Sequence, residues 1–368
     1  MMENGKISSK QVTWMMISFL LGSSILLIPS AVASSAKQDA WVSMLISIVA
    51  GQAVIYNFAS LSMMFPGKTF VQYSREILGK YLGMLAGLIM TWFSLHLGSL
   101  VVRNFGDFLS ATVLQHTPMI VPDSIIVILV AMGTRMGVEV LARVNKLIIP
   151  FMILLILIIF ALGIPEMEFK RILPVMENGV RPVIAGSLVV IGFPYAETVL
   201  FTMIIPFLNS PGKGRKALVT GGLAGGALLF FIVLRTLLVL GPATTVRLWF
   251  PVLETVRMID IFNIIQRIES IVIIAWIFLG FMKISVCFYS FVLGLAQLLN
   301  LKDYRPLVLP AGVLMLALSQ LVYENYVEET YFASQIWFPY AMVPGLILPL
   351  TMLAVAVIRG LGGKKTEK

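Results

Sequence analysis

Charged residues are scarce in this sequence, and their scarcity excludes a soluble domain of ordinary composition. Asp, Glu, Lys and Arg make up 12% of the 368 residues, whereas soluble domains carry about 25%. Hydrophobic residues make up 59%, and the mean hydropathy is +0.95. We therefore expect an all-α polytopic membrane protein, a single membrane domain with nearly all its mass in the bilayer.

Cysteine and histidine are almost absent, which removes several chemistries. The single cysteine, Cys287, cannot form an intrachain disulfide and excludes zinc sites with two or more cysteine ligands. The two histidines, His96 and His116, lie too far apart to indicate a metal pair. With no catalytic constellation or metal motif, we expect no enzyme, no metal and no cofactor. The net charge of +9 is expected from basic cytoplasmic loops rather than from nucleic-acid binding.

Long hydrophobic runs account for most of the chain, and we count about ten of them, most at least as long as the ~20 residues that span a bilayer. Their approximate boundaries are 11–35, 40–65, 81–114, 120–136, 146–164, 182–208, 217–240, 269–299, 306–323 and 335–358. Most of the 27 Lys and Arg residues fall on one side of this arrangement. Basic loops remain in the cytoplasm, so both termini are predicted to be cytoplasmic. The longest connection, 241–268, has the apolar spacing of an amphipathic helix on the extracytoplasmic membrane face.

Two of these segments carry helix-breaking residues near their centres. The first contains Gly22-Ser23-Ser24 followed by Pro29, and the sixth contains Gly192-Phe193-Pro194-Tyr195-Ala196-Glu197. Proline lacks the N–H that a helix needs, and backbone freed within lipid must face protein or water. The segments lie five apart and therefore cross the membrane in opposite directions. Paired interruptions of this kind indicate an inverted repeat, here about 11–164 and 182–358, with a binding site between the breaks.

Two ionisable residues are predicted at mid-membrane, where charge is expensive. Glu197 lies in the sixth segment and Lys283 in the eighth, on a face of small and polar residues. A buried lysine needs a partner or loses its proton, and Glu197 is the obvious candidate. The pair is interpreted either as a structural tie or as a charge or proton site. In the second case the ammonium takes the place of a coupling cation, which argues against sodium coupling.

A polar stripe in the third segment includes Arg103 and Asp107, which are four residues apart and can pair on one helix. We expect a local structural ion pair towards the outer end of that segment.

Several motifs together resemble the B subunit of bacterial spore germinant receptors, over essentially the whole chain. These motifs are Ile7-Ser8-Ser9-Lys10-Gln11, the run from Gly22 to Pro29, Gly137-Val138-Glu139-Val140-Leu141-Ala142-Arg143, Phe193-Pro194-Tyr195-Ala196-Glu197, Arg267-Ile268-Glu269-Ser270 and Lys302-Asp303-Tyr304-Arg305. That family is similar to the amino acid–polyamine–organocation transporters. The resemblance implies a LeuT-like five-plus-five fold whose first and sixth helices are discontinuous.

The resemblance also implies a role and partners. It implies a subunit in a spore inner membrane or bacterial cell membrane that works with an A subunit, a lipoprotein C subunit and sometimes a small D subunit. Germinants of the family are mainly amino acids, so the ligand is expected to be a small nutrient of that class. The candidate ligand-binding residues are Gly22, Ser23, Ser24, Phe193, Tyr195 and Glu197. Ser23 and Ser24 stand where many amino-acid transporters are glycine-rich.

Three functions are compatible with these residues. The first is a receptor subunit that binds a small molecule at the paired breaks and shifts a two-state equilibrium. The second is a proton-coupled amino acid transporter that uses Glu197 or Lys283. The third is an assembly subunit whose broken helices are vestigial.

Overall fold

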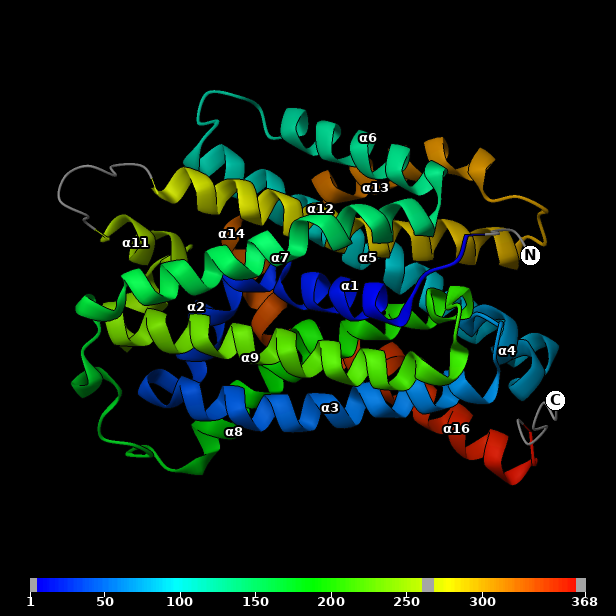
Figure 1. The fold of residues 1–368 in the computed structure, drawn as a ribbon, viewed down its shortest axis with the longest axis horizontal. Coiled ribbons are helices and arrows are strands. Elements are labelled where there is room, and N and C mark those ends of the chain that lie inside the picture. The colour runs from blue at the N-terminus through cyan, green and yellow to red at the C-terminus, as the bar shows by residue number, and fades with distance from the viewer. Residues whose placement is uncertain (1–4, 260–267, 362–368) are drawn as a thin grey trace.

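The computed structural model describes residues 5–259 and 268–361, and within them the fold is a bundle of helices (Figure 1). The α-helices are α1 (Ser9–Leu21), α2 (Ser24–Ala36), α3 (Ala40–Met64), α4 (Phe70–Leu78), α5 (Lys80–Thr112), α6 (Ile120–Met136), α7 (Val138–Leu162), α8 (Val180–Val190), α9 (Gly214–Leu240), α10 (Pro242–Arg247), α11 (Pro251–Arg257), α12 (Ile268–Leu298), α13 (Val308–Leu321), α14 (Tyr326–Tyr331), α15 (Trp337–Met342) and α16 (Leu348–Ile358). Short 3₁₀ or π turns occupy Lys37–Asp39, Ile164–Glu166, Phe169–Ile172, Ile191–Tyr195, Ala196–Met203, Ile205–Phe207, Pro211–Lys213, Arg305–Leu307, Phe332–Ile336 and Val343–Ile347.

Seven helical stretches within the described residues are long and apolar enough to cross a membrane. One of them, Ser24–Met64, joins α2 and α3, and a shorter apolar helix covers Arg305–Leu321. Each predicted apolar segment contains at least one α-helix, so the prediction of an all-helical polytopic protein is confirmed.

The fifth predicted segment begins earlier than expected. Its helix, α7, starts at Val138, whereas the sequence indicated a start near residue 146. Glu139, Arg143 and Lys146 made the first two turns resemble a loop. In the structure Glu139 and Arg143 form an i, i+4 ion pair on the surface of α7, so the charges belong to a helix that extends beyond its apolar part.

The connection 241–268 forms two short helices, α10 and α11, in place of one continuous helix, and its residues 260–267 lie outside those described. Gly241 has φ of 76° and ends α9, a backbone conformation that glycine adopts readily. Helix α11 contacts α2, α9 and α12. Its Val252, Leu253 and Val256 are buried, so this segment covers one end of the bundle.

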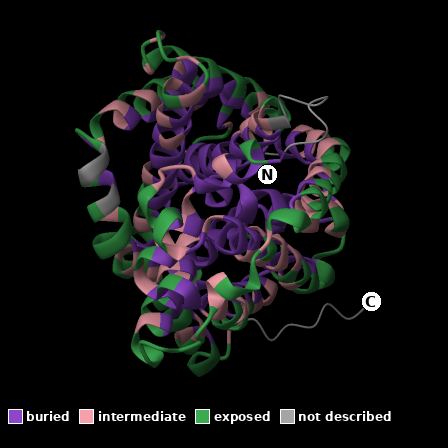
Figure 2. Cartoon of the chain, turned by 90° about the vertical axis from the view of Figure 1, so that its left-hand side faces the viewer, coloured by how far each residue is buried: buried purple, intermediate pink, exposed green. Residues whose placement is uncertain are grey.

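Helix α1 lies in the middle of the bundle (Figure 1), whose interior Figure 2 shows by burial. Buried residues fill the centre of that view and exposed residues surround them. Helix α1 packs against α7, α9 and α12. By contrast, α7 buries only 17% of its most apolar window. Its Leu147 and Phe151 are each 69% exposed, as expected for a helix that faces lipid.

Main-chain pairing ties the start of α1 to the end of the sixth segment. The Ile7 N–H donates to the carbonyl of Phe207 at 2.9 Å, and the Asn209 N–H donates to the carbonyl of Ile7 at 2.9 Å. Helix α1 then begins with a capping box, in which Ser8 Oγ accepts from the Gln11 N–H at 3.2 Å and Gln11 Oε1 accepts from the Ser8 N–H at 2.8 Å. The Ser-x-x-Gln motif thus fixes where the central helix starts.

Candidate functional site

The first break separates α1 from α2 at Gly22 and Ser23. The Gly22 N–H still donates to the Ser18 carbonyl at 2.8 Å, but Gly22 itself has φ 0° and ψ −116°. A Cβ atom added at Gly22 would lie 2.7 Å from Cδ of Lys283 and 2.9 Å from its Cβ. Glycine is therefore required here, because the aliphatic part of the Lys283 side chain approaches closely. Helix α2 starts at Ser24 without a side-chain cap, so the N–H groups of its first turn have no capping partner.

The second break lies at Phe193. Helix α8 ends at Val190, and Phe193 has the extended dihedral angles φ −130° and ψ 110°. The chain resumes as a 3₁₀ helix, Ala196–Met203, which places Glu197 in its first turn. Both segments are thus discontinuous, as their sequences predicted.

Lys283 joins the two breaks. Its Nζ lies 2.7 Å from Oε2 of Glu197, and both side chains are fully buried. Nζ also donates to Oγ of Ser23 at 3.2 Å, so one side chain on α12 contacts both interrupted helices. The ammonium lies 4.6 Å from the ring centroid of Phe193 and 5.2 Å from that of Phe19, within the range of cation–π attraction.

Glu197 keeps unused hydrogen-bonding capacity. Its Oε1 forms no hydrogen bond of normal geometry with any described residue, although the Trp337 indole lies close by. Ser24 Oγ, at the start of α2, is likewise buried and has no partner among the described side chains and backbone. Unsatisfied buried oxygens cost free energy, and of these two residues Glu197 lines the cavity described next, so its Oε1 is the candidate acceptor for a ligand.

A cavity of about 250 Å³ borders the breaks. Ser23, Phe193 and Glu197 line its inner part, and it extends along α2 to Ser34 and to Val246 on α10. The walls are mostly apolar with a few polar groups, which is typical of small-molecule sites. Trp337, at the start of α15, lines it beside Glu197.

A charged cluster lies at the other end of this cavity. Arg103 and Asp107 form the expected ion pair, with Nε 2.9 Å from Oδ2, and Arg103 also donates to the carbonyl of Tyr323 at 2.9 Å. Glu329 on α14 lines the cavity. With its amide nitrogen directed at Glu329, Asn104 donates to Oε1 at 2.7 Å. Burial and the nearby Asp107 carboxylate raise the pKa of Glu329 to about 7.

The structure brings together only some of the predicted ligand residues. Ser23, Phe193 and Glu197 line the cavity, whereas Gly22 and Ser24 are not among its lining residues. Tyr195 lies away from it. Its ring packs onto Gly51 of α3, and its hydroxyl donates to the Gly222 carbonyl of α9 at 3.4 Å. The extended backbone at Phe193 directs the Tyr195 side chain away from the cavity.

Sequence reasoning missed Asn104, Glu329 and Trp337. Asn104 follows Arg103 and faces the cavity rather than the polar stripe. Glu329 stands in an acidic connection that is usually solvated, and Trp337 begins an apolar segment where tryptophan is common at the interface. None of these positions carries a local signal, because their role depends on how α14 and α15 fold over α5.

Solved transporters share this architecture. The nucleobase–cation symporter Mhp1, closed with bromovinylhydantoin bound, aligns with a TM-score of 0.68 at 13% identity, covering 96% of this chain and 94% of that one. MhsT in complex with L-phenylalanine aligns with a TM-score of 0.69 at 14% identity, covering 96% of this chain and 99% of that one. The fold is therefore LeuT-like, as the resemblance implied.

Sequence relatives agree over nearly the full length. Spore germination protein KB of Bacillus subtilis is 30% identical over 97% of this chain and 96% of its own. Spore germination protein YndE of Bacillus subtilis is 27% identical over 81% of this chain and 82% of its own. A family model described as "Spore germination protein" matches residues 6–327. This match covers most of the chain, and the protein belongs to the spore germination protein family.

Proposed function

We propose that this protein is the ligand-binding membrane subunit of a spore germinant receptor, and that its germinant, an amino acid, binds in the cavity between the two broken helices. The observation that supports this most directly is the buried carboxylate of Glu197. It lines the cavity, and one of its oxygens has no hydrogen bond among the described residues.

The cavity offers complementary groups for an amino acid. The free oxygen of Glu197 is an acceptor for the ligand's ammonium group. The first turn of α2 presents unpaired N–H groups at the break, and a helix N-terminus favours a carboxylate. The apolar wall, including Phe193 and Leu97, suits the ligand's side chain.

Lys283 favours a receptor over a sodium-coupled transporter. Its ammonium already sits between the two breaks, paired with Glu197 and bonded to Ser23. A fixed cation at this point replaces the mobile cation that a symporter would exchange. A ligand that binds Glu197 and Ser23 competes with Lys283 for these two residues and so weakens the contacts between α12 and both broken helices. The ligand then binds the conformation with weakened contacts more tightly, and a two-state signal requires such a difference in affinity.

The receptor model includes partners and a location. We place the subunit in the spore inner membrane with both termini cytoplasmic, in complex with A and C subunits and, in some receptors, a D subunit. Helices α10 and α11 cover the end of the bundle towards which the cavity extends, so their displacement is the readout that we propose for the partner subunits.

Binding of radiolabelled amino acids to the purified chain tests this proposal. We expect saturable binding of at least one amino acid and about a tenfold or greater loss of affinity in Glu197→Gln, because a charge-assisted hydrogen bond is lost. Glu254→Gln, which removes a surface acid on α11, is the matched control and should bind normally. Equal binding by Glu197→Gln and the wild type would overturn the site.

Liposomes that contain the chain alone separate a receptor from a transporter. The receptor predicts binding without accumulation of label inside the liposomes. Accumulation driven by a proton gradient and abolished by Glu197→Gln would instead establish the proton-coupled transporter.

A further inference from the structure

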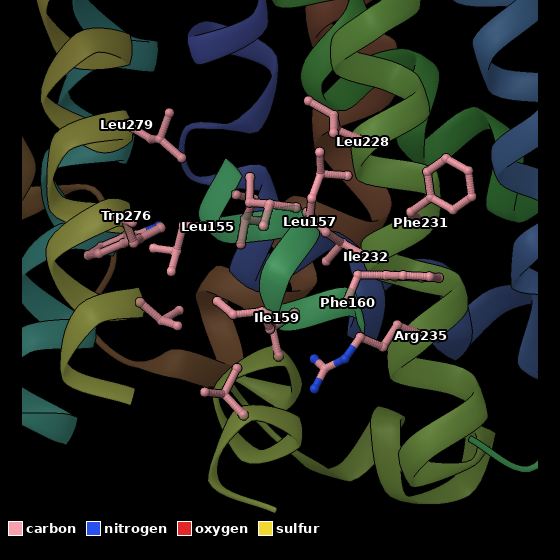
Figure 3. A pocket seen from close by; sticks show the side chains of 16 residues that line it. Leu155, Leu157, Ile159, Phe160, Leu228, Phe231, Ile232, Arg235, Trp276 and Leu279 are labelled. Carbon is pink, nitrogen blue, oxygen red and sulfur yellow. The ribbon is translucent and has the colours of Figure 1, made fainter. Parts of the chain in front are cut away.

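A second cavity lies apart from the ligand cavity, between α7, α9 and α12, and is closed at one end by α11 (Figure 3). Its volume is about 180 Å³. Except for one arginine and one tryptophan, every side chain that lines it is aliphatic or phenylalanine. Among the described residues, no side chain lines both cavities.

The arginine is Arg235 of α9, which is 4% exposed. Its Nη1 donates to Oγ1 of Thr255 at 2.7 Å, and its Nη2 donates to the Thr255 carbonyl at 3.0 Å. Its Nε, beside Gly163, has no acceptor, and no carboxylate of the described residues lies within ion-pair distance of the guanidinium. A buried cation that has only neutral partners is costly unless a counter-ion supplements them.

A second unpaired donor lies across the cavity. The indole Nε1 of Trp276, on α12, is buried and bonded to no described residue. Figure 3 shows Arg235 and Trp276 on opposite sides of the cavity, carried by different helices. Two unsatisfied donors in one cavity call for a ligand that carries acceptor oxygens.

The cavity is almost wholly apolar, and its one charged residue lies near one end. Arg235 lies near its α11 end, and the wall of α9 continues through Ile232 to Leu228, seven residues or about 10 Å further into the bundle. On α12 the wall runs from Val272 to Leu279 over the same depth. Figure 3 shows Leu228 and Leu279 at the end remote from Arg235. A suitable occupant has an anionic head and an apolar tail.

One wall of the cavity belongs to the helix that faces lipid. Leu155, Leu157 and Phe160 of α7 line it. Leu157 is half-exposed, and little of the α7 apolar surface is buried within the bundle. The bilayer is therefore the source from which an occupant reaches the cavity.

We propose that this cavity binds an anionic phospholipid of the membrane. The phosphate accepts hydrogen bonds from Arg235, an ester carbonyl accepts from Trp276, and one acyl chain lies along the wall from Ile232 to Leu228. The lipid neutralises the buried guanidinium of Arg235. It also contacts α7, α9 and α11 together, at the end of the bundle that α11 covers. This site is independent of the proposed germinant.

Purified full-length protein, delipidated in neutral detergent, provides the test. We expect phosphatidylglycerol to bind, measured by native mass spectrometry and by the rise in melting temperature, and phosphatidylcholine of the same chains to bind at least about tenfold more weakly. Arg235→Gln should abolish this preference. Arg257→Gln removes a positive charge from the surface of α11 at the same end of the bundle and should preserve the preference.

Two further variants keep the proposal testable if Arg235→Gln does not fold. Trp276→Phe keeps an aromatic ring beside Phe105, whose ring centroid lies 5.4 Å from that of Trp276, and removes the N–H donor together with the five-membered ring. Ala275→Leu adds bulk to the wall and leaves Arg235 intact. Both should weaken phosphatidylglycerol binding by several fold. Equal binding of the two lipids by the wild type, unchanged binding in these variants, or the same stabilisation by glycerol 3-phosphate alone would overturn the lipid site.

Discussion

Removing one member of the Glu197–Lys283 pair should destabilise the protein strongly, and removing both should restore much of the loss. The charges are 2.7 Å apart and fully buried. At an effective dielectric constant of about 20, their attraction is about 6 kcal/mol, much of which offsets their desolvation. Breaking such a pair on one side costs about 3–5 kcal/mol, whereas replacing both members by apolar groups is often neutral.

The two single variants differ in the contacts that the remaining charged side chain keeps. In Glu197→Leu the ammonium keeps the Ser23 hydroxyl and the faces of Phe193 and Phe19. In Lys283→Met the carboxylate loses its cation and keeps only the nearby Trp337 indole. We therefore expect Lys283→Met to be the more damaging single change, unless the carboxylate takes up a proton at low pH.

A double-mutant cycle checks this reasoning. The melting temperatures of wild type, Glu197→Leu, Lys283→Met and the double variant are measured in the same detergent at neutral pH. The coupling should be at least about 2 kcal/mol, with the double variant more stable than Lys283→Met. Additive losses, or a Lys283→Met protein as stable as the wild type, would refute a pair that carries this much energy. Unchanged germination in a Lys283→Met strain would also remove Lys283 from the signalling site.

Three further outcomes follow from the structure. Gly51→Ala should lower the free energy of unfolding by about 1–3 kcal/mol, because its Cβ would lie 2.3 Å from the Tyr195 ring. Gly212→Ala, where the Cβ would have no neighbour within 4 Å, is the control and should unfold at the wild-type temperature. Equal melting curves for the two variants would contradict the packing of Tyr195 on Gly51. Ser8→Ala should lower the free energy of unfolding by about 1 kcal/mol, because it removes the capping box. Ser9→Ala is its control in the same thermal unfolding assay. Folding raises the pKa of Glu329 from 4.5 to about 7, so the folded state holds a proton that the unfolded state releases above about pH 4.5. Stability therefore falls as pH rises from about 4.5 to 7 and is level above that. The groups around this carboxyl are Asp107, Arg103, Asn104, Glu328 and Tyr323. Glu329→Gln should flatten the pH dependence, and an unaltered pH profile would exclude Glu329 as its source.

Sequence reasoning located the membrane segments because their length and hydropathy depend on the bilayer alone. It also located both breaks, since glycine and proline act locally on the backbone. The predicted start of α7 was too late in the chain, because Glu139 and Arg143, which form an ion pair on its first turns, cannot be told from a charged loop in the sequence. The helix α4, between α3 and α5, was missed because its nine residues are too few to give an apolar run.

Side-chain placement was harder to predict than the helices. The polar face of α12 predicted Glu197 as the candidate partner of Lys283, but whether the two side chains touch depends on the packing of α12 against the second break. Tyr195 points to α3 and α9 because the extended backbone of Phe193 changes the register on either side of it. The contribution of Glu329 and Asn104 to the cavity arises only where α14 folds over α5.

The two main-chain hydrogen bonds between Ile7 and the segment 207–209 connect the start of the first broken helix to the end of the second. Backbone bonds of this kind do not depend on the side chains that flank them, proline excepted, so we expect this end to stay fixed. In the receptor that we propose, a motion that starts at the breaks would then displace α2 and α8, and the displacement would increase with distance from these bonds. The largest displacement falls where α2 meets α10 and α11.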